Sequence, residues 1–155
     1  MRDKRFIAEH RGGLLTKEQH RQLTTWACRC VRRVMRLAGE KPDDRLRHAL
    51  LIARAWTHGK AATGDARNAS LQAIAAARAC SNPAAIAVAR AAGHAVATAH
   101  MADHSLRAAL YALKAAKHAG RPVALERAWQ NRQLPPEVRD LVLSSRVEKE
   151  KYFHI

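Results

Sequence analysis

Apolar residues recur at intervals of three and four between Thr16 and Gly39, which is the spacing of an amphipathic helix. Thr16 and Gln19 have the spacing of a capping box, in which the two residues satisfy each other's backbone N–H groups. The apolar stripe of this helix consists of Leu23, Trp26, Ala27, Cys30, Val34 and Leu37. A second stripe gathers Arg29, Arg32, Arg33 and Arg36. The pattern therefore predicts a helix that begins after Thr16, ends at Gly39 and carries a basic face.

Six further helices follow from the same periodicity and from their end signals. The second is capped by Asp43 or Asp44 and ends at His58-Gly59. Its buried face carries Leu46, Ala49, Leu50, Ala53 and Trp56. The others are expected over about 63–80, 84–101, 103–118, 121–132 and 136–145, with Ser81-Asn82-Pro83 as one of the breaks. A single helix that continues across Ala102 is the alternative to a break there, and residues 148–151 are expected to form a solvated end.

These elements indicate an all-α protein. No run of β-branched and aromatic residues alternates with period two over the length of a strand. Alanine supplies 28 of the 71 residues between positions 49 and 119, and alanine has the best intrinsic helix propensity. We predict about seven helices in a compact orthogonal or solenoid-like array of helical hairpins, with an N-terminal extension over 1–15 and a single helical domain over 16–155.

Cysteine usage and hydropathy indicate the cellular compartment that we expect for the protein. Three cysteines, Cys28, Cys30 and Cys80, form no disulfide framework, and the first 13 residues lack the apolar core of a signal peptide. No uninterrupted apolar run is long enough to cross a bilayer. We therefore expect a cytoplasmic protein with reduced thiols and no membrane partner. A structural role is favoured for Cys28 and Cys30, with Cys28 the candidate for a reactive thiol.

The charge is strongly unbalanced, since 28 Lys and Arg stand against 13 Asp and Glu, a net charge of +15. Such a field favours an anionic partner, and the exposed arginines are the candidates for contacting it. The predicted partner-binding residues are Arg29, Arg32, Arg33, Arg36, Arg45 and Arg47, which Arg54 extends. A basic nucleic-acid-binding module stays open as an alternative, although no helix-turn-helix with recognition residues is evident and aromatic residues for base stacking are few.

Histidine and aspartate side chains gather in the segment AAGHAVATAHMADH, as His94, His100, Asp103 and His104. These residue types bind zinc, and on one continuous helix His100 and His104 would share a face. His94 would then lie about 120° around the helix from His100, so one helix cannot present all three histidines to a single ion. Hydrogen bonding between closely packed helices is the favoured role, with Asp103 as a helix cap. We predict no metal and no cofactor.

The chain resembles the bacterial immunity proteins of the Imm-5-like family. The segments that support the resemblance are FIAEHRGGLLTKEQHRQLTTWACRC, KPDDR, ARAWTHG, AARAAGHAVATAHMADHSLRAALYALKA and LPPEVRDLVLSSRVEKEKYF. They extend from Phe6 to Phe153, and AGHAVATAHMADH is the most specific of them. The resemblance implies a protein that neutralises a toxin and supplies no established binding or catalytic residues.

Three functions remain from the sequence. The first is a non-enzymatic immunity protein that binds a cognate toxin stoichiometrically, and the charge of this chain then implies an acidic toxin surface or a toxin that is not a nuclease. The second is the nucleic-acid-binding module. The third, and the least favoured, is a metal-dependent enzyme built from the His94–His104 region. A symmetric homodimer is open on base rates alone.

Overall fold

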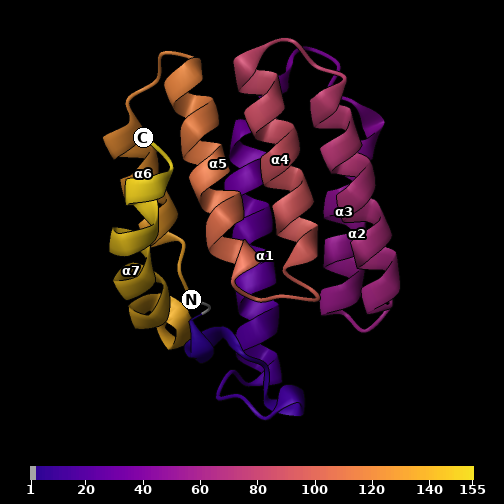
Figure 1. The fold of residues 1–155 in the computed structure, drawn as a ribbon, viewed down its shortest axis with the longest axis vertical. Helices are drawn as coiled ribbons and strands as arrows, with labels where there is room; N and C mark the ends of the chain where they lie inside the picture. Colours follow the sequence, from indigo (N-terminus) through magenta and orange to yellow (C-terminus); the bar gives the residue numbers. More distant parts are fainter. Residues whose placement is uncertain (1–2) are drawn as a thin grey trace.

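The computed structural model describes residues 3–155, and over those residues it contains seven α-helices joined by short turns (Figure 1). The helices are α1 (Lys17–Val34), α2 (Asp44–Thr57), α3 (Thr63–Arg78), α4 (Pro83–Ala97), α5 (His104–His118), α6 (Val123–Arg132) and α7 (Pro136–Lys149). Single 3-10 turns lie at Lys4–Phe6, Glu9–Arg11, Met35–Ala38 and Glu150–Tyr152. The predicted all-α class and the number of helices are confirmed.

Helix α4 lies at the centre of the array. Figure 1 shows α4 and α5 side by side, with α1 behind them, α2 and α3 on one side and α6 and α7 on the other. The packing contacts agree, because α4 contacts α1, α2, α3 and α5. Eleven of its 15 residues are buried, and most of these are alanine. Successive helices in this central part pack as the predicted hairpins.

Small residues allow α3 and α4 to approach closely. A Cβ atom added to Gly93 would lie 3.0 Å from Ile74 Cγ1 and 3.4 Å from the carbonyl oxygen of Ser70. Contacts this short would require Ile74 to move by a few tenths of an ångström, so a side chain at position 93 would disturb the packing of the two helices. The lack of a side chain at Gly93 therefore allows the close packing of α3 and α4.

The predicted helix starts are also confirmed. Thr16 Oγ1 accepts a hydrogen bond from the Gln19 N–H at 3.1 Å, and Gln19 Oε1 accepts one from the Thr16 N–H at 2.9 Å. Asp43, rather than Asp44, caps α2, and Asn82 caps α4 ahead of Pro83. The capping box therefore fixes where α1 begins.

We expect Thr16→Ala to lower the free energy of unfolding by about 1 kcal/mol, because the Gln19 N–H at the start of α1 loses its acceptor. Urea denaturation followed by circular dichroism measures this difference. Thr16→Ser keeps the hydroxyl group and serves as the control, which should stay within about 0.5 kcal/mol of the unaltered chain. Equal losses in the two variants would contradict a capping role for the hydroxyl group.

Two helices are shorter than predicted. α1 ends at Val34 and continues as the 3-10 turn Met35–Ala38 before Gly39, which has a φ of 113°. α4 ends at Ala97 rather than near Met101, and residues 98–103 form the turn into α5. The break that the sequence left open near Ala102 is therefore real. It brings the histidines on its two sides together from different helices.

The two terminal segments pack against the helices. Phe6 and Leu15, which precede α1, are buried in the same core as the helices. Residues 1 and 2 of the predicted N-terminal extension lie outside the described residues. The prediction of a solvated C-terminal end was wrong for Glu150, whose carboxylate pairs with Arg127 and Arg146 at 2.9 Å and 3.1 Å.

Candidate functional site

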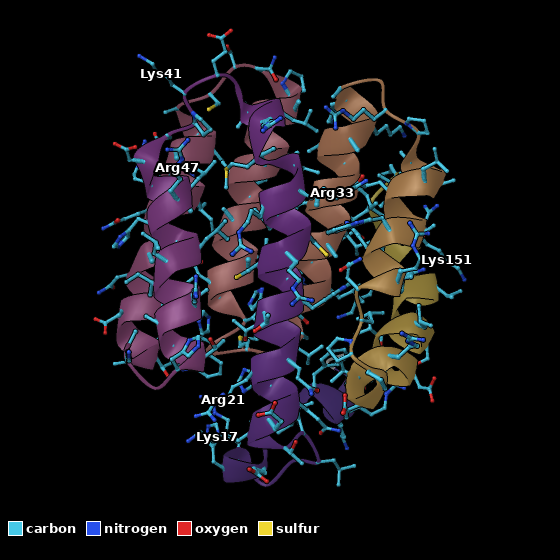
Figure 2. All side chains as sticks on the ribbon, turned by 180° about the vertical axis from the view of Figure 1, so that it is seen from behind. Lys17, Arg21, Arg33, Lys41, Arg47 and Lys151 are labelled. Atoms are coloured by element: carbon cyan, nitrogen blue, oxygen red, sulfur yellow. The ribbon has the colours of Figure 1, made fainter. Side chains whose placement is uncertain are left out.

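The predicted arginine face of α1 divides between two neighbouring helices. Arg29, Arg32, Arg33 and Arg36 are all exposed, as the stripe predicted. Figure 2 shows Arg33 on the side of α1 that faces α6, whereas Arg47 lies on α2 across the molecule. The six predicted arginines therefore do not converge on one point.

Two of the six arginines are held by carboxylates of the chain itself. Arg33 Nε donates to both carboxylate oxygens of Glu126 at 3.0 and 3.1 Å, and its guanidinium lies 4.3 Å from the centre of a Trp129 ring. Arg45 pairs with Asp43 at 2.8 Å. Arg33 thus fastens α6 to α1, and Arg45 supports the cap of α2.

Arg29 and Arg32 line a cavity of about 260 Å³ between α1 and α2, which we call the arginine cavity. Its lining residues are Thr25, Cys28, Arg29, Arg32, Ala53, Arg54, Thr57 and His58. No Asp or Glu is among these described lining residues, and within residues 3–155 Arg29, Arg32 and Arg54 form no ion pair. Three guanidinium groups around one cavity, without a counter-charge, make it a site of positive potential that would attract carboxylates or phosphates.

Neither cysteine of α1 is a reactive thiol. Cys28 and Cys30 are both buried, and burial raises the pKa of the Cys28 thiol to about 12. Burial also raises the pKa of Cys30. Because only the thiolate is nucleophilic, Cys28 is inert at neutral pH, although the sequence made it the candidate for a reactive thiol. Its role is packing beneath the arginine cavity.

The histidine cluster forms where α4 meets the start of α5. His94 Nδ1 lies 2.8 Å from His104 Nδ1, and the two rings stack with their centres 4.9 Å apart. Tyr111 stacks on His94 at 5.3 Å with an angle of 8° between the rings. His100 tilts against His104 at 5.6 Å. The favoured prediction of hydrogen bonding between packed helices describes this contact between α4 and α5.

Electrostatics keep the His94 ring neutral. Burial, reinforced by His104 and by the positive charges of Arg107 and Arg90, lowers the pKa of His94 to about 3. The hydrogen bond between the two Nδ1 atoms requires one ring to donate and the other to accept, so two doubly protonated rings cannot share it. A neutral His94 is therefore part of the folded state at neutral pH.

The cluster has no arrangement suited to a metal ion. Within residues 3–155, no group of three or more His, Cys, Asp and Glu side chains is placed to hold one. The predicted capping role of Asp103 is only positional, because Asp103 occupies the N-cap position of α5 without a capping hydrogen bond from its side chain. The geometry therefore supports a packing role for His94 and His104.

Sequence reasoning missed a further aromatic contact, which involves the buried His20 of α1. His20 Nε2 donates to the carbonyl oxygen of Thr98 at 2.6 Å, and its ring lies 4.7 Å from the ring of Trp56. Burial lowers the pKa of His20. Thr98 belongs to the turn between α4 and α5, so this bond ties α1 to the turn. The sequence gives no signal for this burial, because His20 comes before Leu23, the first residue of the apolar stripe, and polar residues in the first turn of a helix are usually exposed.

A cavity of about 560 Å³ lies beside His20 at the same end of the molecule. It is lined by the N-terminal segment, the first turns of α1, Trp56, Thr63 and residues 99–102. Its polar side chains include both signs of charge, since Glu9 lies among Arg11, Lys17 and three histidines. This mixture favours no single ligand class.

Comparison with known proteins gives one match. A family model described as "Imm-5 like putative immunity protein" matches residues 13–137. No curated protein and no solved structure matches the chain. Among the helices of residues 3–155, none has both the length and the apolar character needed to span a membrane.

Proposed function

The chain belongs to the Imm-5 like family of immunity proteins, and on that basis we propose that it neutralises a cognate bacterial toxin by stoichiometric protein–protein binding. Family membership indicates a role in binding rather than in catalysis. Neutralisation of this kind needs no chemistry from the protector, only a preorganised surface that covers the toxin.

The observation that supports this proposal most directly is the arginine cavity. Arg29, Arg32 and Arg54 extend from helices α1 and α2, so the backbone that carries them is already ordered before binding. A guanidinium group binds a carboxylate through two parallel hydrogen bonds, which gives both affinity and orientation. We therefore assign to the toxin an acidic surface that inserts Asp or Glu side chains between α1 and α2. The charge of +15 would accelerate encounter with such a surface.

The test begins with identifying the toxin. The tagged chain is incubated with lysate of its host, treated with nuclease and washed at high salt, and the retained protein is identified by mass spectrometry and purified. We expect a complex of fixed stoichiometry, and we expect co-expression of the chain to restore growth of cells that produce the toxin. Loss of every partner together with the nucleic acid would contradict the proposal and favour the nucleic-acid-binding alternative.

Arg29→Gln combined with Arg32→Gln should raise the dissociation constant of the toxin complex by about 10-fold to 100-fold, because two arginines that would pair with carboxylates of the toxin are removed. Isothermal titration calorimetry with the purified toxin measures this change. The control is Arg67→Gln combined with Arg78→Gln, which removes the same charge from exposed positions of α3. If both double variants weakened toxin binding equally, the effect would come from net charge alone. That result would overturn the assignment of the arginine cavity.

A further inference from the structure

A second basic cavity, of about 370 Å³, lies between α5 and the C-terminal segment of the chain. Its lining residues are Arg107, Tyr111, Lys114, Lys149, Tyr152 and Phe153. Two contacts hold the C-terminal segment against α5. The Phe153 ring meets the edge of the Tyr111 ring at 5.0 Å, and Lys117 Nζ donates to the carbonyl oxygen of His154 at 2.6 Å. We call this the α5 cavity.

Aromatic side chains are concentrated there. The chain has only two tyrosines and two phenylalanines, and both tyrosines and one phenylalanine line this single cavity. Tyr111 is already engaged, since it stacks on His94 and meets Phe153. Tyr152 is 76% exposed, so its ring is accessible at the cavity edge. An accessible tyrosine ring is a surface on which a planar ligand can stack.

The same cavity is lined by three cationic side chains. Within the described chain, no Asp or Glu lines it, and Arg107 and Lys114 form no ion pair. Lys149 is half-buried, and its ammonium lies 5.4 Å from the Phe6 ring, toward an adjoining cavity. Burial lowers the pKa of Lys149, because removing the ammonium from water disfavours its charged form. An anion in the cavity would offset this effect.

Acidic side chains mark where the anion would not bind. Asp3, Asp103 and Glu148 line the adjoining cavity, which shares Arg107, Lys149 and Tyr152 with the α5 cavity. Lys114 lines only the α5 cavity, so a phosphate that contacts Lys114 lies on the side of Arg107 away from these carboxylates. The arrangement is thus polarised, with an anion site beside α5 and an exposed ring at its edge.

We propose that the α5 cavity binds a nucleotide, with its phosphates at Arg107 and Lys114 and its base stacked on Tyr152. A nucleotide combines the two chemistries that the cavity offers, an anionic group for guanidinium and ammonium donors and a planar ring for an aromatic face. The volume lies within the range of small-molecule sites. The nucleotide can be free or can be a residue of a single strand, because both present the same phosphate and base. This inference does not rest on toxin neutralisation, since the cavity shares no residue with the arginine cavity.

The test is equilibrium binding of ADP to the purified chain by isothermal titration calorimetry, beside adenosine, inorganic pyrophosphate and a short single-stranded oligonucleotide. We expect ADP to bind more tightly than either adenosine or pyrophosphate, since each of these lacks one half of the recognised chemistry. Binding of the oligonucleotide but not of ADP, with the same dependence on Tyr152, would assign the site to a strand. Pyrophosphate binding as tight as that of ADP would overturn the nucleotide assignment.

Variants separate a local site from the general positive charge. Tyr152→Ala should weaken ADP binding roughly fivefold or more, while Tyr152→Phe keeps the ring and should restore it. Arg107→Gln combined with Lys114→Gln should weaken it about tenfold or more, as two charged phosphate contacts are lost. The charge-matched control is again Arg67→Gln combined with Arg78→Gln. Equal losses in both double variants, or unchanged binding in Tyr152→Ala, would overturn the proposal, and circular dichroism of each variant checks that it is folded.

Discussion

Arg146→Ala should lower the free energy of unfolding by about 3–5 kcal/mol, the largest loss that we expect from a single substitution. Arg146 is the only buried arginine among residues 3–155, at 3% exposure. Its guanidinium donates to the side-chain oxygens of Gln130 and Asn131 and pairs with Glu150 at 3.1 Å. Removing it leaves two amide oxygens without their donor and leaves the partly buried Glu150 carboxylate with Arg127 as its remaining partner, which costs more than the contacts themselves contribute.

Replacing Arg146 should also weaken contacts outside α7, because Gln130 hydrogen-bonds to two other helices. The Gln130 carbonyl oxygen accepts from Trp26 Nε1 at 2.9 Å, and its side-chain nitrogen donates to the carbonyl oxygen of Ala109 at 3.0 Å. Arg146 therefore orients the Gln130 side chain, which connects α6 with α5, at a residue whose backbone carbonyl connects α6 with α1. Urea denaturation monitored by tryptophan fluorescence would report the change near Trp26.

Arg132→Ala is the control for this prediction, since Arg132 is exposed on α6 and its replacement removes the same charge. It should change the free energy of unfolding by no more than about 0.5 kcal/mol. Glu150→Gln, which removes the carboxylate but keeps an acceptor oxygen, should fall between the two. Arg146→Ala that is as stable as Arg132→Ala would mean that water replaces the guanidinium in this network.

The sequence predicted the helices but could not predict this network. Helix periodicity and capping are local signals, so Thr16, Asp43 and Asn82 could be identified from residues within three positions of each. Arg146 and Gln130 are 16 positions apart, and each looks like an ordinary polar residue of a helix surface. Their burial depends on how α6 and α7 pack against α1, and alanine-rich helices carry few bulky side chains that specify such packing.

At the candidate site, too, local sequence signals predict some features, and packing between helices decides the others. The stripe on α1 correctly placed Arg29 and Arg32 at the surface, but it could not show that Arg33 is taken up by Glu126 of α6. The sequence predicts Arg54 only as an extension of the basic face, whereas the structure places it in the same cavity as Arg29 and Arg32. Pairing between helices decides which basic residues keep a free charge, and pairing is not visible in a periodic pattern.

The histidine segment was predicted as a close helix contact, and the turn at residues 98–103 determines how it forms. On one continuous helix His94 and His104 would be almost three turns apart and could not touch. The turn folds α5 back along α4, which brings the two Nδ1 atoms to 2.8 Å. The contact therefore depends on the helix break and on the neutral state of His94.

The stability of the fold should increase with pH between about 3 and 6.5, because His94 must remain neutral in the folded state. Its pKa is about 3 in the folded chain, against the ordinary histidine value of 6.5 in the unfolded chain, so within this interval the unfolded chain binds more protons. The contribution is complete above about pH 6.5 and is lost progressively as the pH falls toward 3. Its full size is on the order of 5 kcal/mol, since each pKa unit corresponds to about 1.4 kcal/mol. His20, whose pKa is also lowered, acts in the same direction.

His94→Asn tests this assignment, because asparagine keeps hydrogen-bonding groups but does not titrate in this range. Between pH 4 and 6 the slope of unfolding free energy against pH should fall by up to about 1.4 kcal/mol per pH unit, which is the effect of one proton. Urea titrations at several pH values measure both slopes. His118→Asn is the matched control, since His118 is exposed at the end of α5 and should leave the slope unchanged. The assignment would be contradicted if His94→Asn and the unaltered chain had the same slope. The charges of Arg90, Arg107 and His104 would then not act through His94. The buried His20 would be the next group to replace.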